Sequence, residues 1–100
     1  MAKRKVVWTI NSEFQLKDIL EFYTIRNKSS NYSKKLYEKF KSELKTAASN
    51  PDIGVKTKLE NIRGLIIRDY ILFYEVLDDR IMVLKVWDCR QDPNKLDIER

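Results

Sequence analysis

The sequence predicts an α+β domain in which an N-terminal strand and an antiparallel hairpin of two helices precede a mainly antiparallel sheet, in the order β-α-α-β-β-β. Three observations lead to this prediction. A β-branched and aromatic run occupies residues 5–10, two amphipathic segments with a polar break between them fill residues 12–48, and three strand-like runs separated by turn residues make up residues 62–90. The helices are expected to pack on one face of the sheet.

The first strand is predicted at residues 5–10, KVVWTI, because such side chains suit a pleated, half-buried surface. Ser12 is the expected N-cap of the first helix, since Gln15 follows at the spacing of a capping box. One stripe of this helix is expected to be buried, and it comprises Leu16, Ile19, Leu20 and Tyr23, widened by Phe14, Phe22 and Ile25.

A polar break at residues 27–33 separates the first helix from a second, which is predicted to run to about Ala48. The apolar residues at helical spacing, which define its buried face, are Leu36, Phe40, Leu44 and Ala47. The rest of the helix is rich in lysine, with Lys34, Lys35, Lys39, Lys41 and Lys45. These lysines form either a solvated outer face or a phosphate-contacting surface, and the second interpretation requires a concave site beside them.

The second half of the chain is predicted to form the sheet. Pro51 and Gly54 end the second helix, residues 55–61 form a loop or short edge strand, and strands follow at residues 62–68, 70–77 and 80–87. Asp78 and Asp79 are expected to make a two-residue hairpin turn between the last two strands. The polar segment after Trp87 is expected to be a frayed turn or to add a little helix. Helices on one side leave the opposite face of the sheet partly open, and a site is expected on that concave face.

Composition narrows the classes of function. One hundred residues suffice for one domain, 1–100, with one modest core. Residues 1–50 carry 11 Lys and Arg against 5 Asp and Glu, while residues 51–100 carry 9 against 10, so the basic excess lies in the first half and favours a polyanionic or acidic partner. With one cysteine and no histidine, an intramolecular disulfide and a Cys/His metal site are excluded, and no cofactor is expected. Neither a signal peptide nor a membrane span is predicted, which fits a cytoplasmic protein.

Several segments, taken in order, resemble the RelE/ParE superfamily of bacterial toxins from type II toxin–antitoxin modules. They are VVWT before the first helix, NPDIG after the second, IRGLIIRDYILFYEV in the sheet and VLKVWDCRQDP near the end, together covering roughly residues 6–93. The resemblance implies a growth inhibitor, held inactive in a hetero-oligomer by a cognate antitoxin. RelE-like members cut messenger RNA in the ribosome and ParE-like members poison DNA gyrase, so fold alone leaves the target open.

The resemblance also supplies candidates for a ribonuclease site. Cleavage by 2′-hydroxyl attack needs a base, an acid and cations that stabilise the phosphorane charge. Arg90, Arg63, Arg68 and Glu60 are the candidate catalytic residues. Glu60 is a candidate base and Arg90 a candidate phosphate clamp, with Asp88 as a further partner, because a guanidinium can meet two oxygens at once.

Other features of the sequence argue against a nuclease. Arg63 and Arg68 could equally edge a strand and pair with Asp69 or Glu75. RelE-like enzymes usually carry arginine where this chain has Ile71, and many relatives carry histidine where it has Asp88, a residue that is ionised at neutral pH and repels phosphate.

The only thiol, Cys89, lacks a histidine to activate it and is expected to be partly buried.

Because Ile71 and Asp88 depart from the nuclease pattern, we expect a ParE-like, gyrase-directed or nuclease-deficient toxin. The alternatives are a RelE-like ribosome-dependent mRNA endoribonuclease and a non-toxic small basic RNA-binding domain.

Overall fold

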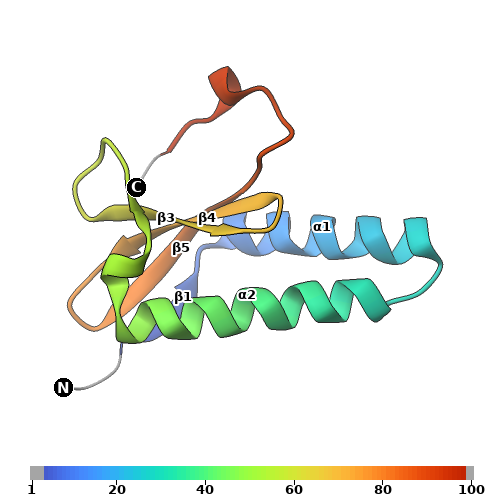
Figure 1. Cartoon of the computed structure of the whole chain (residues 1–100), viewed down its shortest axis with the longest axis horizontal. Coiled ribbons are helices and arrows are strands. Elements are labelled where there is room, and N and C mark those ends of the chain that lie inside the picture. Colours follow the sequence, from blue (N-terminus) through green and yellow to red (C-terminus); the bar gives the residue numbers. More distant parts are fainter. Residues whose placement is uncertain (1–3, 99–100) are drawn as a thin grey trace.

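The computed structural model describes residues 4–98. Its elements, in chain order, are β1 (Lys5–Trp8), α1 (Ile10–Asn27), α2 (Asn31–Ser49), the 3-10 turn η1 (Pro51–Ile53), β2 (Val55–Lys56), β3 (Ile62–Ile67), β4 (Tyr70–Val76), β5 (Arg80–Asp88) and the 3-10 turn η2 (Pro93–Lys95). The two helices lie side by side, and the C-terminal segment arches away on the opposite side of the sheet (Figure 1). The predicted α+β class and element order are confirmed, and of the two alternatives for residues 55–61 the short edge strand is found, as β2. The ends of the predicted domain, residues 1–3 and 99–100, lie outside the described residues.

The strands form one sheet in the order β1-β5-β4-β3-β2. β1 pairs parallel to β5, and the other neighbours are antiparallel. Two parallel strands need a long connection between them. Here the chain from β1 to β5 passes first through the α1–α2 hairpin and then through β2, β3 and β4. Leu77 N–H donates to the Arg80 carbonyl at 2.9 Å, so Asp78 and Asp79 form the predicted hairpin turn. The strand predicted at residues 62–68 ends one residue early, at Ile67, because Arg68 lies in the following turn with a left-handed φ of 54°.

The start of α1 differs from the prediction. Thr9, not Ser12, is the N-cap, and its side chain accepts a hydrogen bond from Ser12 N–H at 3.1 Å. Ser12 is fully buried and donates to the Val83 carbonyl at 2.8 Å, while Gln15 accepts from Val86 N–H at 2.8 Å. The Val83 carbonyl lies opposite the end of β1 and also accepts from Thr9 N–H at 3.1 Å, whereas Val86 lies beyond the residues that pair with β1. Both polar side chains therefore attach the first turns of α1 to β5.

The core lies between α2 and the middle of the sheet. Leu36 and Phe40 of α2 are completely buried, together with Leu72 and Tyr74 of β4. The Tyr74 hydroxyl donates to the Pro51 carbonyl at 2.6 Å and accepts from Gly54 N–H at 3.1 Å. A β-carbon on Gly54 would collide with that hydroxyl, so the turn after α2 needs a glycine at this position for close approach.

The second face of the sheet is less open than expected. Leu96 and Ile98 of the C-terminal segment, with Leu59 and Phe73, line an apolar hollow of about 510 Å³ on this face, and Phe73 is buried. The Lys85 ammonium donates to the Asp97 carbonyl at 2.5 Å. The polar tail therefore folds back over the face on which a site was expected. The little helix that this segment was expected to add is the 3-10 turn η2.

Candidate functional site

Arg90, the strongest candidate from the sequence, lies two residues after the end of β5 and is held by a network of side chains. Its Nε and Nη2 donate to the two carboxylate oxygens of Asp88, each at 2.9 Å, and its backbone N–H donates to the same carboxylate at 2.9 Å. Nη2 also lies 3.2 Å from the Tyr23 hydroxyl and 3.3 Å from the Tyr70 hydroxyl. Asp88 and two phenols of the protein itself thus take up the fork of the guanidinium that would grip a phosphate.

The charges in this network stabilise one another. Hydrogen bonding from Arg90 lowers the pKa of Asp88, so this carboxylate stays ionised in the folded protein. Burial, followed by the hydrogen bond to Tyr23, raises the pKa of Tyr70, whose hydroxyl donates to Tyr23 at 3.1 Å. The group as a whole is a hydrogen-bonded pair of phenols closed by an ion pair.

Arg68 lies at the other side of the same aromatic group. Its guanidinium lies over the ring of Tyr32 at 5.7 Å, and the ring of Tyr32 packs edge-on against Tyr23 at 4.7 Å. Arg68 forms no ion pair within residues 4–98, so the expected pairing with Asp69 or Glu75 is not found there. The fold thus gathers Arg68 and Arg90 around Tyr23 and Tyr32.

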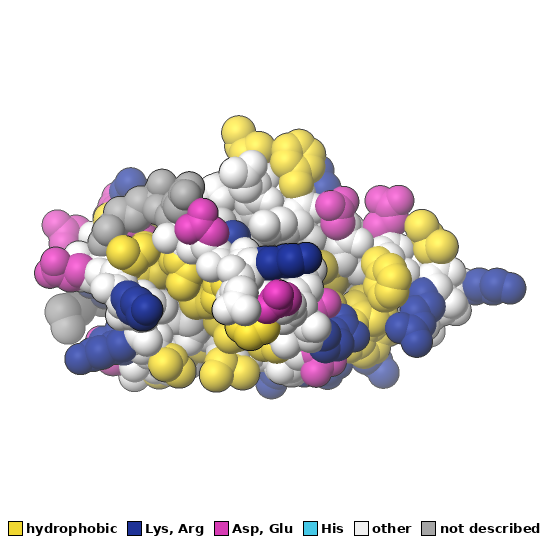
Figure 2. Space-filling model, turned by 90° about the horizontal axis from the view of Figure 1, so that it is seen from above, with side chains coloured by type: hydrophobic (Ala, Val, Ile, Leu, Met, Phe, Trp, Pro, Cys, Tyr) yellow, Lys and Arg dark blue, Asp and Glu magenta, His cyan; other side chains and the backbone are white. Residues whose placement is uncertain are grey.

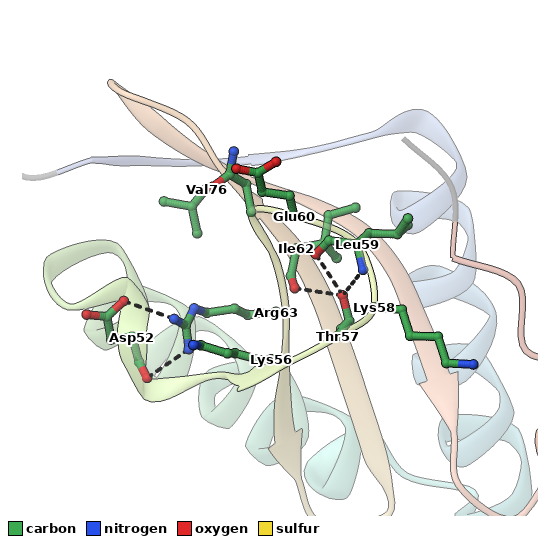
Figure 3. Close-up of a pocket in the computed structure, with 10 residues that line it drawn as sticks. Asp52, Lys56, Thr57, Lys58, Leu59, Glu60, Ile62, Arg63 and Val76 are labelled. Atoms are coloured by element: carbon green, nitrogen blue, oxygen red, sulfur yellow. Dashed lines mark hydrogen bonds and ion pairs between the residues drawn. The ribbon is translucent and has the colours of Figure 1, made fainter.

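Arg63 and Glu60 lie elsewhere, at a hollow of about 420 Å³ between the loop after β2 and the start of β3. The ion-pair partner of Arg63 is Asp52, and not Asp69 or Glu75 as expected. Its guanidinium lies 3.2 Å from a carboxylate oxygen of Asp52 and donates to the Gly54 carbonyl at 2.8 Å. Figure 3 shows Asp52 and Arg63 turned toward each other, and Glu60 on the far side of the hollow near Val76. The four predicted catalytic residues are therefore divided between two places.

Cys89 and the acidic residues supply no further chemistry. The thiol is exposed, not partly buried as expected, and desolvation with the nearby carboxylates of Asp88 and Asp69 raises its pKa. Within residues 4–98 no group of three His, Cys, Asp or Glu side chains is placed to hold a metal ion. In the same part of the chain no helix is long and apolar enough to cross a membrane.

Comparison with known proteins decides the family. The family model for the ParE toxin of type II toxin–antitoxin systems, parDE, matches residues 6–93. The chain belongs to the ParE toxin family. A solved structure described as the chromosomal ParDE TA system from P. aeruginosa is similar in fold, with a TM-score of 0.71 and 14% identity over 86% of this chain and 96% of that one. A search of curated proteins finds no match. This ParE toxin is thus the toxin component of a type II module, as the sequence predicted.

One surface of this ParE toxin was missed by the sequence analysis. Phe14, Phe22 and Ile25 were expected to widen the buried stripe of α1, but they are 59%, 52% and 68% exposed, and Ile10 is 73% exposed. The side of α1 that packs inward carries Leu16 and Tyr23 instead. At about 100° per residue the two groups fall on opposite sides of the helix, and this separation is the signal that could have revealed the surface.

Proposed function

We propose that this ParE toxin inhibits bacterial growth by acting on DNA gyrase, without cutting RNA, until a cognate antitoxin neutralises it in the cytoplasm. The choice of gyrase over messenger RNA as the target rests on the contacts of the Arg90 guanidinium. A nuclease needs a cation that is free to meet the scissile phosphate, and here Asp88, Tyr23 and Tyr70 already take up that guanidinium.

The separation of the other candidates supports the same proposal. Glu60 and Arg63 share the loop hollow, while Arg68 and Arg90 flank the tyrosines, so a base and the phosphate-binding cations do not converge on one reacting atom. Asp88 is ionised and cannot supply the proton that a leaving oxygen needs. A protein–protein inhibitor requires none of these groups to converge.

The position of Arg68 favours a ribonuclease as the second candidate function. Its guanidinium makes no ion pair among the described residues and lies over an aromatic ring, an arrangement that also suits a phosphate beside a stacked base. In this second reading Arg68 binds the message, and Arg90 must leave Asp88 when RNA arrives.

Two assays separate the candidates. Purified protein is added to a gyrase supercoiling reaction, and separately to ribosomes on a defined message whose cuts are mapped by primer extension. We expect loss of supercoiling and an uncut message, and addition of the purified product of the adjacent reading frame restores supercoiling. Message cutting that Arg68→Ala abolishes would replace the gyrase proposal by the nuclease.

A further inference from the structure

The outward side of α1 is apolar at both ends and acidic in the middle. We call it the outer face of α1, and it consists of Ile10, Phe14, Asp18, Glu21, Phe22 and Ile25, all exposed. At about 100° per residue these positions span an arc of about 120°. Seen from above, acidic side chains lie between hydrophobic ones on the half of the molecule where α1 runs (Figure 2).

Two hollows flank this face and meet at Asp18. One, of about 550 Å³, is lined by Phe14 together with Leu84 and Lys85 of β5; the other, of about 390 Å³, is lined by Phe22 together with Tyr70 and Arg90. Asp18 lines both. Each exposed phenylalanine therefore stands beside a hollow that a partner's side chain can enter, with a carboxylate between the two hollows.

A second copy of the toxin fits this face poorly. The face is centred on Asp18, so two α1 helices packed antiparallel about that centre would set Phe14 against Phe22 and Asp18 against its own copy. Two carboxylates that are brought together in an interface that excludes water repel each other and lose their hydration. The carboxylate of Asp18 thus opposes self-association through the apolar side chains of this face.

The charge of α1 also differs from that of the rest of the first half. α1 carries Lys17 and Arg26 against three acids, Glu13, Asp18 and Glu21, whereas α2 carries five lysines against two glutamates. A uniformly acidic partner suits α2 and is repelled by the middle of α1. Among the described residues Asp18 has no hydrogen bond or ion pair, so any partner that covers it must supply a positive charge or bury a bare carboxylate.

We propose that the outer face of α1 docks an amphipathic helix of the antitoxin whose apolar stripe is interrupted near its middle by one Lys or Arg that pairs with Asp18. This inference rests on the proposed neutralisation by an antitoxin and adds the chemistry of the contact. Apolar side chains on either side of that basic residue enter the two flanking hollows. The buried ion pair sets the register of the two helices and excludes a partner with no cation at that position.

The test measures binding of the purified product of the adjacent reading frame to three forms of the full-length toxin. Asp18→Lys is compared with wild type and with Glu38→Lys, a matched exchange on α2 at a side chain that is 70% exposed. Both variants add two positive charges, so a general effect of net charge acts on both. We expect at least tenfold weaker binding for Asp18→Lys and less than twofold for Glu38→Lys, with unchanged melting temperatures.

Exchange of each antitoxin Lys and Arg for Glu, one at a time, then identifies the facing residue. One such exchange should restore at least tenfold of the lost affinity to Asp18→Lys and should weaken binding to wild type. If wild type binds but Asp18→Lys binds equally well, or if no exchange rescues it, the inference is wrong and the antitoxin proposal stands. If wild type does not bind at all, the antitoxin proposal itself fails, and the inference fails with it.

Self-association gives a measurement that needs no antitoxin. Asp18→Leu removes the central charge, and sedimentation velocity should show at least tenfold stronger self-association than for wild type or for the control Glu38→Leu. A monomeric Asp18→Leu at the same concentrations would contradict the role of Asp18 in keeping the face free for another partner.

Discussion

The two helices of the hairpin have similar lengths, 18 residues in α1 and 19 in α2, but they use their apolar residues differently. In α2 the apolar residues lie mainly on one side, where Leu36, Phe40 and Leu44 are buried, and lysines cover the solvent side. In α1 apolar residues lie on both sides, and Phe14 and Phe22 remain exposed. The apolar residues of α2 thus pack mainly in the core, whereas those of α1 both pack in the core and form an exposed surface.

The largest effect that separates the two helices is expected from truncating one phenylalanine in each. Phe40→Ala in α2 empties a fully buried site and should lower the free energy of unfolding by about 3–5 kcal/mol. Phe14→Ala in α1 removes an exposed ring and should change it by less than about 0.5 kcal/mol. Urea denaturation followed by tryptophan fluorescence measures both. Equal losses would show that Phe14 is part of the core in solution.

The second effect concerns how α1 is attached to the sheet. Ser12→Ala removes the side-chain hydrogen bond to the Val83 carbonyl, which keeps the Thr9 N–H as a donor, so the change should cost about 0.5–1.5 kcal/mol of unfolding free energy. Ser42→Ala, at an exposed position of α2, is the matched control and should change stability by less than about 0.5 kcal/mol. The comparison fails if the two variants unfold at the same urea concentration.

Sequence patterns predicted most of the fold because strand alternation and turn residues act locally. The hairpin at Asp78 and the end of α2 before Pro51 needed no knowledge of distant residues. In α1 the predicted stripe of Leu16, Ile19, Leu20 and Tyr23 does pack inward. The error was to add Phe14, Phe22 and Ile25 to it, because periodicity does not show whether a second apolar arc is also covered. Ser12 was predicted as the N-cap from local spacing alone, whereas its hydroxyl in fact bonds the Val83 carbonyl of β5, 71 residues away.

The candidate site was harder to predict for the same reason. The sequence marked Arg90 and its neighbour Asp88, which lie two residues apart, but Tyr23 lies 67 residues from Arg90 and no local pattern joins them. Arg63 was assigned the wrong alternative partners because its true partner, Asp52, belongs to the turn after α2. The prediction that Arg90, Arg63, Arg68 and Glu60 act in catalysis is not tested by this geometry.

The smallest effect concerns the ion pair at the end of β5, which connects the sheet to Tyr23 of α1, whereas the ion pairs of α2 lie within that helix. Arg90 lowers the pKa of Asp88 in the folded protein, so the stabilisation is present above the unfolded value of about 4 and is lost as the pH falls through the folded value.

Asp88→Asn should therefore cost less than about 1 kcal/mol at pH 7, since Arg90 is half exposed, and the cost should vanish by about pH 2. Urea denaturation at pH 7, 5, 3 and 2 measures this difference. Asp18→Asn, which also loses one carboxylate but breaks no ion pair within residues 4–98, is the control. A cost for Asp88→Asn that stays constant down to pH 2 would mean that Arg90 does not hold this carboxylate ionised. The contact between α1 and the end of β5 would then depend on the tyrosines alone.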